Sequence, residues 1–103
     1  MSTTSFYVKQ NDTKPVIDAQ LLQDGSIVEL TGCTVRFNMG KKSLGPASIV
    51  SESEGRVRYT WGATDLEKSG TFLAEFEVTF SDDTIETFPN TETLVIVVTK
   101  EIA

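Results

Sequence analysis

The sequence predicts an all-β domain that folds as a sandwich or a small barrel. The clearest sign is the stretch 70–80, GTFLAEFEVTF, in which large apolar and mostly polar side chains alternate strictly. Period-two alternation is typical of a strand with one buried and one solvated face. The stretches 33–39 and 56–61 alternate in the same way, and turn signals separate short apolar runs along the chain. Repeated short strands with such turns favour a sandwich or a barrel.

Residues 70–80 are predicted to form the central strand. The inward positions of this strand are Phe72, Ala74, Phe76, Val78 and Phe80. A helix would place Phe76 beside Phe80 but would turn Val78 to the opposite side, so a strand fits the pattern better. This strand would supply three phenylalanines to a core.

The N-terminal half is predicted to contain four short strands. They cover residues 6–9, 16–22, 27–30 and 33–39. A turn over residues 10–15, ending in Pro15, separates the first two, because Asn and Asp side chains bond their own backbone. A tight turn at 23–26 follows the second, since its Asp-Gly pair supplies the positive φ that such turns need.

The C-terminal half continues with strands and turns. A loop is expected at 40–46, which holds two lysines, two glycines and a proline. The predicted strands then cover residues 47–50, 56–61, 70–80, 84–88 and 93–100. The last is almost continuously apolar, so both of its faces are expected to be covered. Pro89 and Asn90 are expected to end the strand 84–88.

One short helical turn is predicted near 64–69. Thr64 or Asp65 could cap it, and Gly70 would end it. The segment has the shape of the corner that precedes a central strand in immunoglobulin sandwiches, although Phe72 stands where a tyrosine hydroxyl usually bonds the backbone.

Length and charge limit the classes of function. With 103 residues the chain is expected to be a single domain, 1–103. Its net charge is −6, and nine Lys and Arg residues are scattered among fifteen acids. The only adjacent pair, Lys41–Lys42, is expected in a solvated loop. Nucleic acid and membranes are therefore poor partners. The N-terminus is polar and no apolar run approaches a membrane span, so a soluble domain is expected. The single thiol of Cys33 fits synthesis in a cytoplasm.

The sequence offers no catalytic, cofactor-binding or metal-binding residues, and the protein is not expected to be an enzyme. There is no histidine, and Cys33 lies in phase with Val35 and Phe37, so it is expected to be a small core residue rather than a nucleophile. Glu75 and Glu77 share one strand face roughly 7 Å apart, where a solvated pair is favoured over a hydrolytic one.

Two groups of residues allow a binding site as well as a structural role. The side chains of Asp82, Asp83 and Glu86 could hold calcium, but a solvated hairpin is favoured. Tyr59 and Trp61 could form a sugar-stacking platform, but their phase with Val57 favours the core.

An ordered set of stretches resembles the N-terminal immunoglobulin-like domain of phage baseplate upper proteins, which occur on tails of phages of Gram-positive hosts. The matching stretches are residues 6–13, 24–25, 30–37, 55–61, 65, 69–72, 74–82 and 86–90. They cover nearly the whole chain in the family's order and spacing. The chain departs from the family at Cys33, where Ala is common, and at Asp83, where Gly is common.

The resemblance implies an immunoglobulin-like antiparallel β-sandwich that is synthesised in the bacterial host cytoplasm and has a structural role in the virion. Such a domain would attach a larger receptor-binding or appendage protein to the tail tip through contacts with other baseplate or tail-tip proteins, and a homo-oligomer is left open. The family commonly continues into helical or fibre segments, so a chain ending at Ala103 is expected to be a shortened or a stand-alone version. The alternative is a carbohydrate-binding module for host cell-wall glycans.

Edge strands and outward apolar residues are the places where docking is expected, although the sequence does not identify the interface. Edge strands carry unpaired backbone groups. Leu73 and the outward residues of the last strand are candidates, because solvated faces seldom carry apolar side chains.

Overall fold

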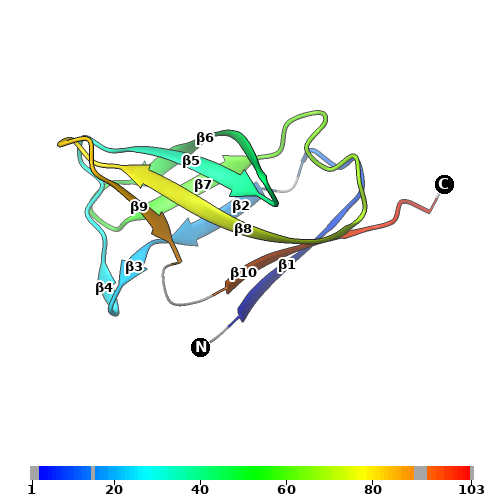
Figure 1. The fold of residues 1–103 in the computed structure, drawn as a ribbon, viewed down its shortest axis with the longest axis horizontal. Coiled ribbons are helices and arrows are strands. Elements are labelled where there is room, and N and C mark those ends of the chain that lie inside the picture. Colours follow the sequence, from blue (N-terminus) through cyan, green and yellow to red (C-terminus); the bar gives the residue numbers. More distant parts are fainter. Residues whose placement is uncertain (1–2, 15, 90–92, 103) are drawn as a thin grey trace.

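The computed structural model describes residues 3–14, 16–89 and 93–102 and shows an all-β architecture (Figure 1). No helix occurs in these ranges. The strands are β1 (Thr3–Lys9), β2 (Val16–Gln20), β3 (Leu22–Gln23), β4 (Ser26–Ile27), β5 (Thr34–Met39), β6 (Lys42–Ser51), β7 (Arg56–Thr60), β8 (Gly70–Thr79), β9 (Ile85–Phe88) and β10 (Thr93–Thr99).

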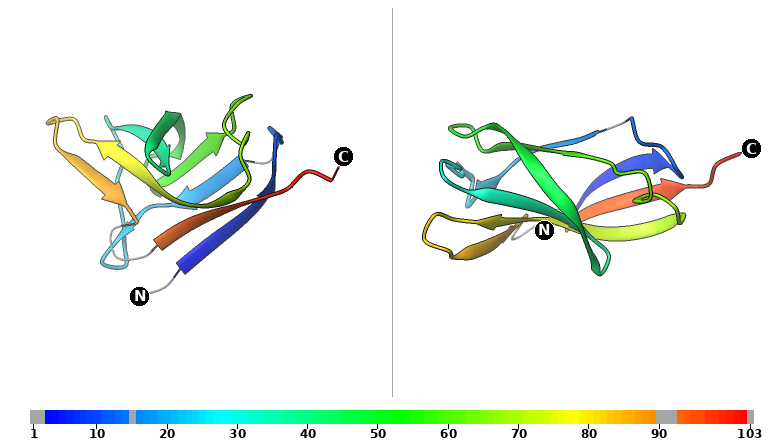
Figure 2. Two further views of the ribbon diagram at one scale, coloured as in Figure 1. Left: turned by 45° about the vertical axis from the view of Figure 1, so that its right-hand side comes forward. Right: turned by 90° about the horizontal axis from the view of Figure 1, so that it is seen from above.

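Eight of the strands form one folded sheet in the order β1-β10-β8-β5-β6-β7-β2, with β9 paired to β8. The sheet folds into two layers, with β2 and β7 in one and β8 and β9 in the other (Figure 2). The strands β3 and β4 form a separate small hairpin. All pairs are antiparallel except β1 with β10, which run parallel. The antiparallel sandwich expected from the sequence is therefore confirmed, with one parallel pair added.

The strand β6 joins the two layers, and it corrects the loop expected at 40–46. Its first part pairs with β5 as far as Ala47, and its second part pairs with β7 from Ser48. Gly40, with φ 64, begins the two-residue turn between β5 and β6, where the first position favours glycine. The register shifts after Phe37, so the glycine and proline that indicated a loop accompany a bulge within a strand.

Two further expectations differ from the structure. The predicted strand 27–30 pairs only through Ser26–Ile27, yet Val28 and Leu30 are buried without belonging to a strand. In place of the helical turn near 64–69 there is a turn at 63–66, which buries Leu66. The roles expected for Pro15 and Asn90 lie outside the described residues, although β9 does end at Phe88.

The core lies between the two layers and is built by the alternation read from the sequence. In β8, Ala74, Phe76 and Val78 are buried, while Phe72 near its start and Phe80, directly after its end, are half-buried. The other fully enclosed large side chains are Phe37, Phe88, Ile17, Leu30, Leu66, Ile96, Val35 and Val57. Aromatic rings meet at the centre, where the Phe37 centroid lies 4.7 Å from Tyr59, 5.7 Å from Trp61 and 5.0 Å from Phe76.

Candidate docking surface

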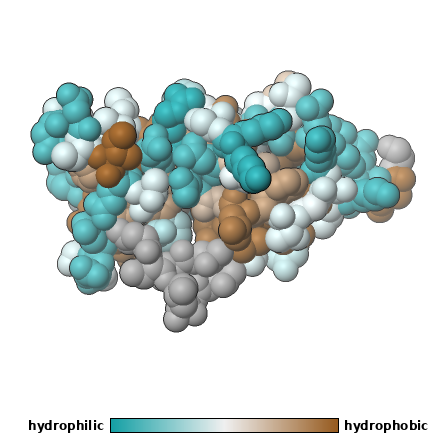
Figure 3. Space-filling view, viewed as in Figure 1, coloured by the Kyte–Doolittle hydropathy of each residue, from teal (hydrophilic) through white to brown (hydrophobic). Residues whose placement is uncertain are grey.

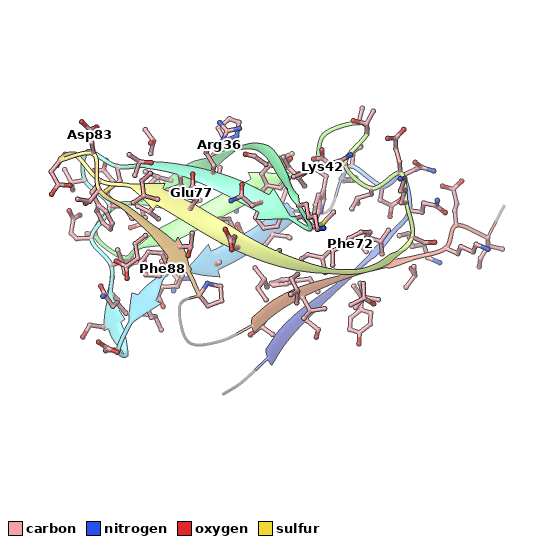
Figure 4. All side chains as sticks on the ribbon, viewed as in Figure 1. Arg36, Lys42, Phe72, Glu77, Asp83 and Phe88 are labelled. Atoms are coloured by element: carbon pink, nitrogen blue, oxygen red, sulfur yellow. The ribbon has the colours of Figure 1, made fainter. Side chains whose placement is uncertain are left out.

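The two glutamates of β8 lie on its outer face, as the sequence predicted. Glu75 and Glu77 are half-buried, and Glu75 Oε2 accepts a hydrogen bond of 3.2 Å from Asn38 Nδ2. Glu77 lies directly opposite Arg36 in the register of β8 with β5, and both lie on the same outer face (Figure 4). Each glutamate therefore has a polar neighbour on a sheet surface, the setting expected for a solvated face.

Of the three carboxylates considered for calcium, Asp82 and Asp83 lie in the turn between β8 and β9, and Glu86 lies within β9. Asp82 Oδ1 accepts hydrogen bonds from Thr84, at 3.1 Å from the backbone nitrogen and 2.6 Å from the hydroxyl. These bonds lower the pKa of the Asp82 carboxyl. Asp83 sits at the tip of the turn with φ 69 (Figure 4). Within the described ranges, no three acidic, cysteine or histidine side chains are grouped so that they could hold a metal ion.

The two aromatic residues considered for sugar stacking belong to the core. Tyr59 is 4% exposed and Trp61 is 3% exposed, and their rings meet edge to face with centroids 5.4 Å apart. Neither ring offers a face to a sugar. The prediction that they pack inside is confirmed, and the platform alternative is not supported by their placement.

Asp65 has a role that the sequence did not indicate. Its Oδ2 accepts a hydrogen bond from the Tyr59 hydroxyl and another, at 2.6 Å, from the backbone nitrogen of Gly62. The carboxylate thus holds the turn at 63–66 against β7 instead of capping a helix. Burial, followed by the hydrogen bond to Asp65, raises the pKa of Tyr59 well above its usual range.

The raised pKa of Tyr59 predicts a loss of stability in alkali. Its contribution is fully present below about pH 10, the ordinary tyrosine value, and is lost as the pH rises further, because the unfolded chain releases the proton that the fold keeps. The variant Tyr59→Phe should lose less stability between about pH 9 and about pH 11. Urea unfolding at a series of pH values measures this. The other titrating groups are shared by the unsubstituted protein and the Tyr59→Phe variant, so only Tyr59 can make their stability profiles differ. Identical profiles of stability against pH would contradict the role assigned to Tyr59.

Cys33 precedes β5 and is half-buried against the core, so the predicted packing role holds only in part. Burial, together with the negative charges of Glu29, Glu52 and Asp82, raises the pKa of its thiol. A raised pKa disfavours the thiolate, which is the nucleophilic form.

The outer face of the layer formed by β1, β10 and β8 carries an apolar patch. Its members, here called the outer apolar patch, are Tyr7, Leu73, Val95 and Val97. Tyr7 is 73% exposed and Leu73 is 64% exposed, while the two valines are half-buried. The strand register places Val95 between Ser5 and Leu73, and Val97 beside Tyr7. Brown apolar atoms gather in this region in Figure 3.

Beside this patch the same face becomes polar. A shallow depression of about 460 Å³ adjoins Leu73, and its lining includes Asn38, Lys41, Lys42, Glu75 and Glu77. The face thus combines an apolar area with charges of both signs at its margin, the composition of many protein interfaces.

The sequence singled out part of this surface. Leu73 and the outward residues of the last strand were expected to be docking candidates, and the structure brings Leu73 and Val95 together as neighbours. Tyr7 was missed, although the alternation of Phe6 and Val8 already places it outward. Thr93, another outward position of β10, has a side chain outside the described set.

Comparisons with known proteins agree with the fold and with the resemblance. Residues 2–102 match the family described as the BppU N-terminal domain. Among solved structures, CopC from Methylosinus trichosporium OB3b is similar, with a TM-score of 0.54 and 11% identity over 100% of this chain and 89% of that one. At that identity the likeness shows the fold alone. No curated protein matches the chain.

The matched family is one of phage baseplate structural domains and is not a family of enzymes. A phage baseplate domain belongs to the virion and has other phage proteins as partners. The match spans almost the entire sequence and confirms the resemblance seen in the ordered stretches. The chain belongs to the BppU N-terminal domain family of phage baseplate upper proteins.

Proposed function

We propose that this domain attaches a larger appendage of the phage to the baseplate or tail tip through protein–protein contact, and that the outer apolar patch is the docking surface. The family match supports the setting, since it covers residues 2–102. The single observation that supports the surface is the exposure of Tyr7 and Leu73 next to Val95 and Val97 on one continuous sheet face.

The physical reason is the cost of leaving this face in water. Single exposed apolar residues are ordinary, but a contiguous group on one face marks an interaction site. A partner that covered Tyr7 and Leu73 would remove their apolar surface from water and gain about 25 cal/mol for each Å². The lysines and glutamates at the margin would then orient the partner more than they would strengthen its binding.

Leu73→Lys tests this surface. We expect it to abolish or strongly weaken complex formation, because it places a charge within a contact that should be dry. The measurement is light scattering of the domain alone and mixed with purified tail-tip proteins of the same phage.

Val50→Lys is the matched control for that experiment. Val50 is 52% exposed and lies in the part of β6 next to β7, away from the patch. It should leave the complex intact. Equal loss of binding in the two variants, or none in Leu73→Lys, would remove the patch from the docking surface.

A further inference from the structure

The strand β1 ends the sheet, and its outer edge has no pairing strand among the described residues. It pairs with β10 alone, over seven consecutive residue pairs from Thr3–Thr93 to Lys9–Thr99 without a register shift. A strand of this length with an open edge offers a row of backbone donors and acceptors to another chain.

The residues that face the open edge follow from the bonds on the other side. The backbone nitrogen of Gln10 donates to Thr99 O at 2.8 Å, and Val8 O accepts a hydrogen bond from the Thr99 hydroxyl at 3.2 Å. Even-numbered residues therefore direct their backbone groups toward β10. Because successive residues of a strand point these groups to opposite sides, Ser5 and Tyr7 direct theirs to the open edge.

Apart from Lys9 at its C-terminal end, this edge lacks the features that usually prevent strand pairing. Natural edges are protected by charges, prolines, bulges or short length. Residues 3–8 include no proline and no charged side chain. By contrast, β2 at the other end of the sheet is five residues long and carries Asp18, which is bonded to Arg58 at 2.6 Å. The edge strand β9 is four residues long and carries Glu86.

We propose that β1 pairs antiparallel with β1 of a second copy of this chain, about a twofold axis at Phe6. The repulsion between two copies of net charge −6 opposes association in general, but it is smallest along β1, because residues 3–8 of both contacting strands are uncharged. A twofold contact uses the same surface on both copies, so a strand that is compatible with itself satisfies it.

The register about Phe6 places compatible groups opposite one another. Ser5 of each copy lies across from Tyr7 of the other, so the backbone groups that face the open edge bond in pairs. On the inner side the two half-buried Phe6 rings meet. Each Phe6 also lines a cavity of about 340 Å³, whose lining includes the apolar Leu21, Phe88 and Leu94 and the acidic Asp18 and Asp24. The second copy would cover the side of this cavity next to β1. On the outer side the two apolar patches become continuous.

Substitutions at Ser5 test the pairing by its main-chain bonds. Ser5→Pro removes the N–H that faces the open edge but no bond to β10, so the monomer should fold. We expect the dissociation constant of the dimer to rise about thirtyfold, because one hydrogen bond is lost from each copy. Ser5→Ala keeps the N–H and should leave the constant within about twofold of the unsubstituted value. Sedimentation equilibrium over a range of protein concentrations measures the dissociation constants of the unsubstituted protein and of the two variants.

A lysine substitution tests the same contact by charge repulsion. Ser5→Lys places one cation from each copy in the contact and should abolish the dimer. Ser48→Lys, at an exposed position of β6, should leave the dimer intact. Hydrogen exchange of the unsubstituted protein needs no variant, and the amides of Ser5 and Tyr7 should exchange more slowly as concentration rises. The proposal would be overturned if the unsubstituted chain remained monomeric or if Ser5→Pro left the dimer unchanged. It would also be overturned if the amides of Ser5 and Tyr7 were protected only after mixing with tail-tip proteins.

Discussion

Phe76→Ala is expected to lower the free energy of unfolding by about 3–5 kcal/mol, the range for truncating a buried aromatic residue. Phe76 is 1% exposed, and its ring centroid lies 5.0 Å from that of Phe37 at the centre of the core. The truncation removes apolar burial and leaves a cavity that strands on both sides hold open, since Phe76 is paired with Phe37 of β5 on one side and with Phe88 of β9 on the other. Chemical denaturation measures the change.

Phe72→Ala serves as the control for this truncation. Phe72 occupies the same face of β8 but is half-buried near the start of the strand, so the same chemical change should cost clearly less. A loss below about 1 kcal/mol for Phe76→Ala would mean that the assignment of the inner face of β8 is wrong.

Gly55→Ala is expected to cost about 2–5 kcal/mol. Gly55 is buried between β6 and β7 with φ +64, a conformation that costs other residues roughly 1–2 kcal/mol. A Cβ there would lie 2.6 Å from Val28 O and 3.1 Å from Leu21 O, so backbone on two sides would have to move, which adds about 1–3 kcal/mol. The movement would also disturb the bond of 2.8 Å from Leu21 N to Gly55 O. Urea unfolding gives the loss.

The turn glycine Gly25 separates the two causes. Its φ is +81, and a Cβ there would meet nothing within 4 Å, so Gly25→Ala should show the backbone strain alone. If both variants lose the same stability, the close approach of Val28 and Leu21 to Gly55 does not contribute.

The alternation of side chains predicted most of the interior, because strand periodicity is a local property. Val57, Tyr59 and Trp61 pack inward as expected, and Leu94, Ile96 and Val98 do the same in β10. The expectation that both faces of β10 are covered holds in part, since Val95 and Val97 are half-buried.

What the sequence did not predict depends on contacts between distant segments. Leu66 is enclosed, but it stands alone among polar residues, and no period marks a single buried side chain in a turn. The strand β6 was hidden by glycine and proline, which signal a loop or a bulge equally well until the pairing strand is known. The parallel pairing of β1 with β10 joins segments 90 residues apart, a separation across which side-chain pattern carries no information about partners.

The docking surface, too, was predicted only where it depends on a single strand. That Leu73 points outward follows from β8 alone, and its exposure was foreseen. That Tyr7, Val97 and Val95 adjoin it follows only from the order β1-β10-β8, because these residues come from three strands. A surface patch of this kind can be suspected residue by residue but can be assembled only in three dimensions.

The parallel alignment of β1 and β10 also bears on how the domain transmits force. The N-terminal end of β1 and the C-terminal end of β10 lie at opposite ends of this pair (Figure 1). Tension between Thr3 and Thr99 therefore pulls the two strands past each other, and their hydrogen bonds are strained together instead of opening one at a time. A domain tethered through both of its ends would bear mechanical load in shear, the direction in which a strand pair resists rupture most.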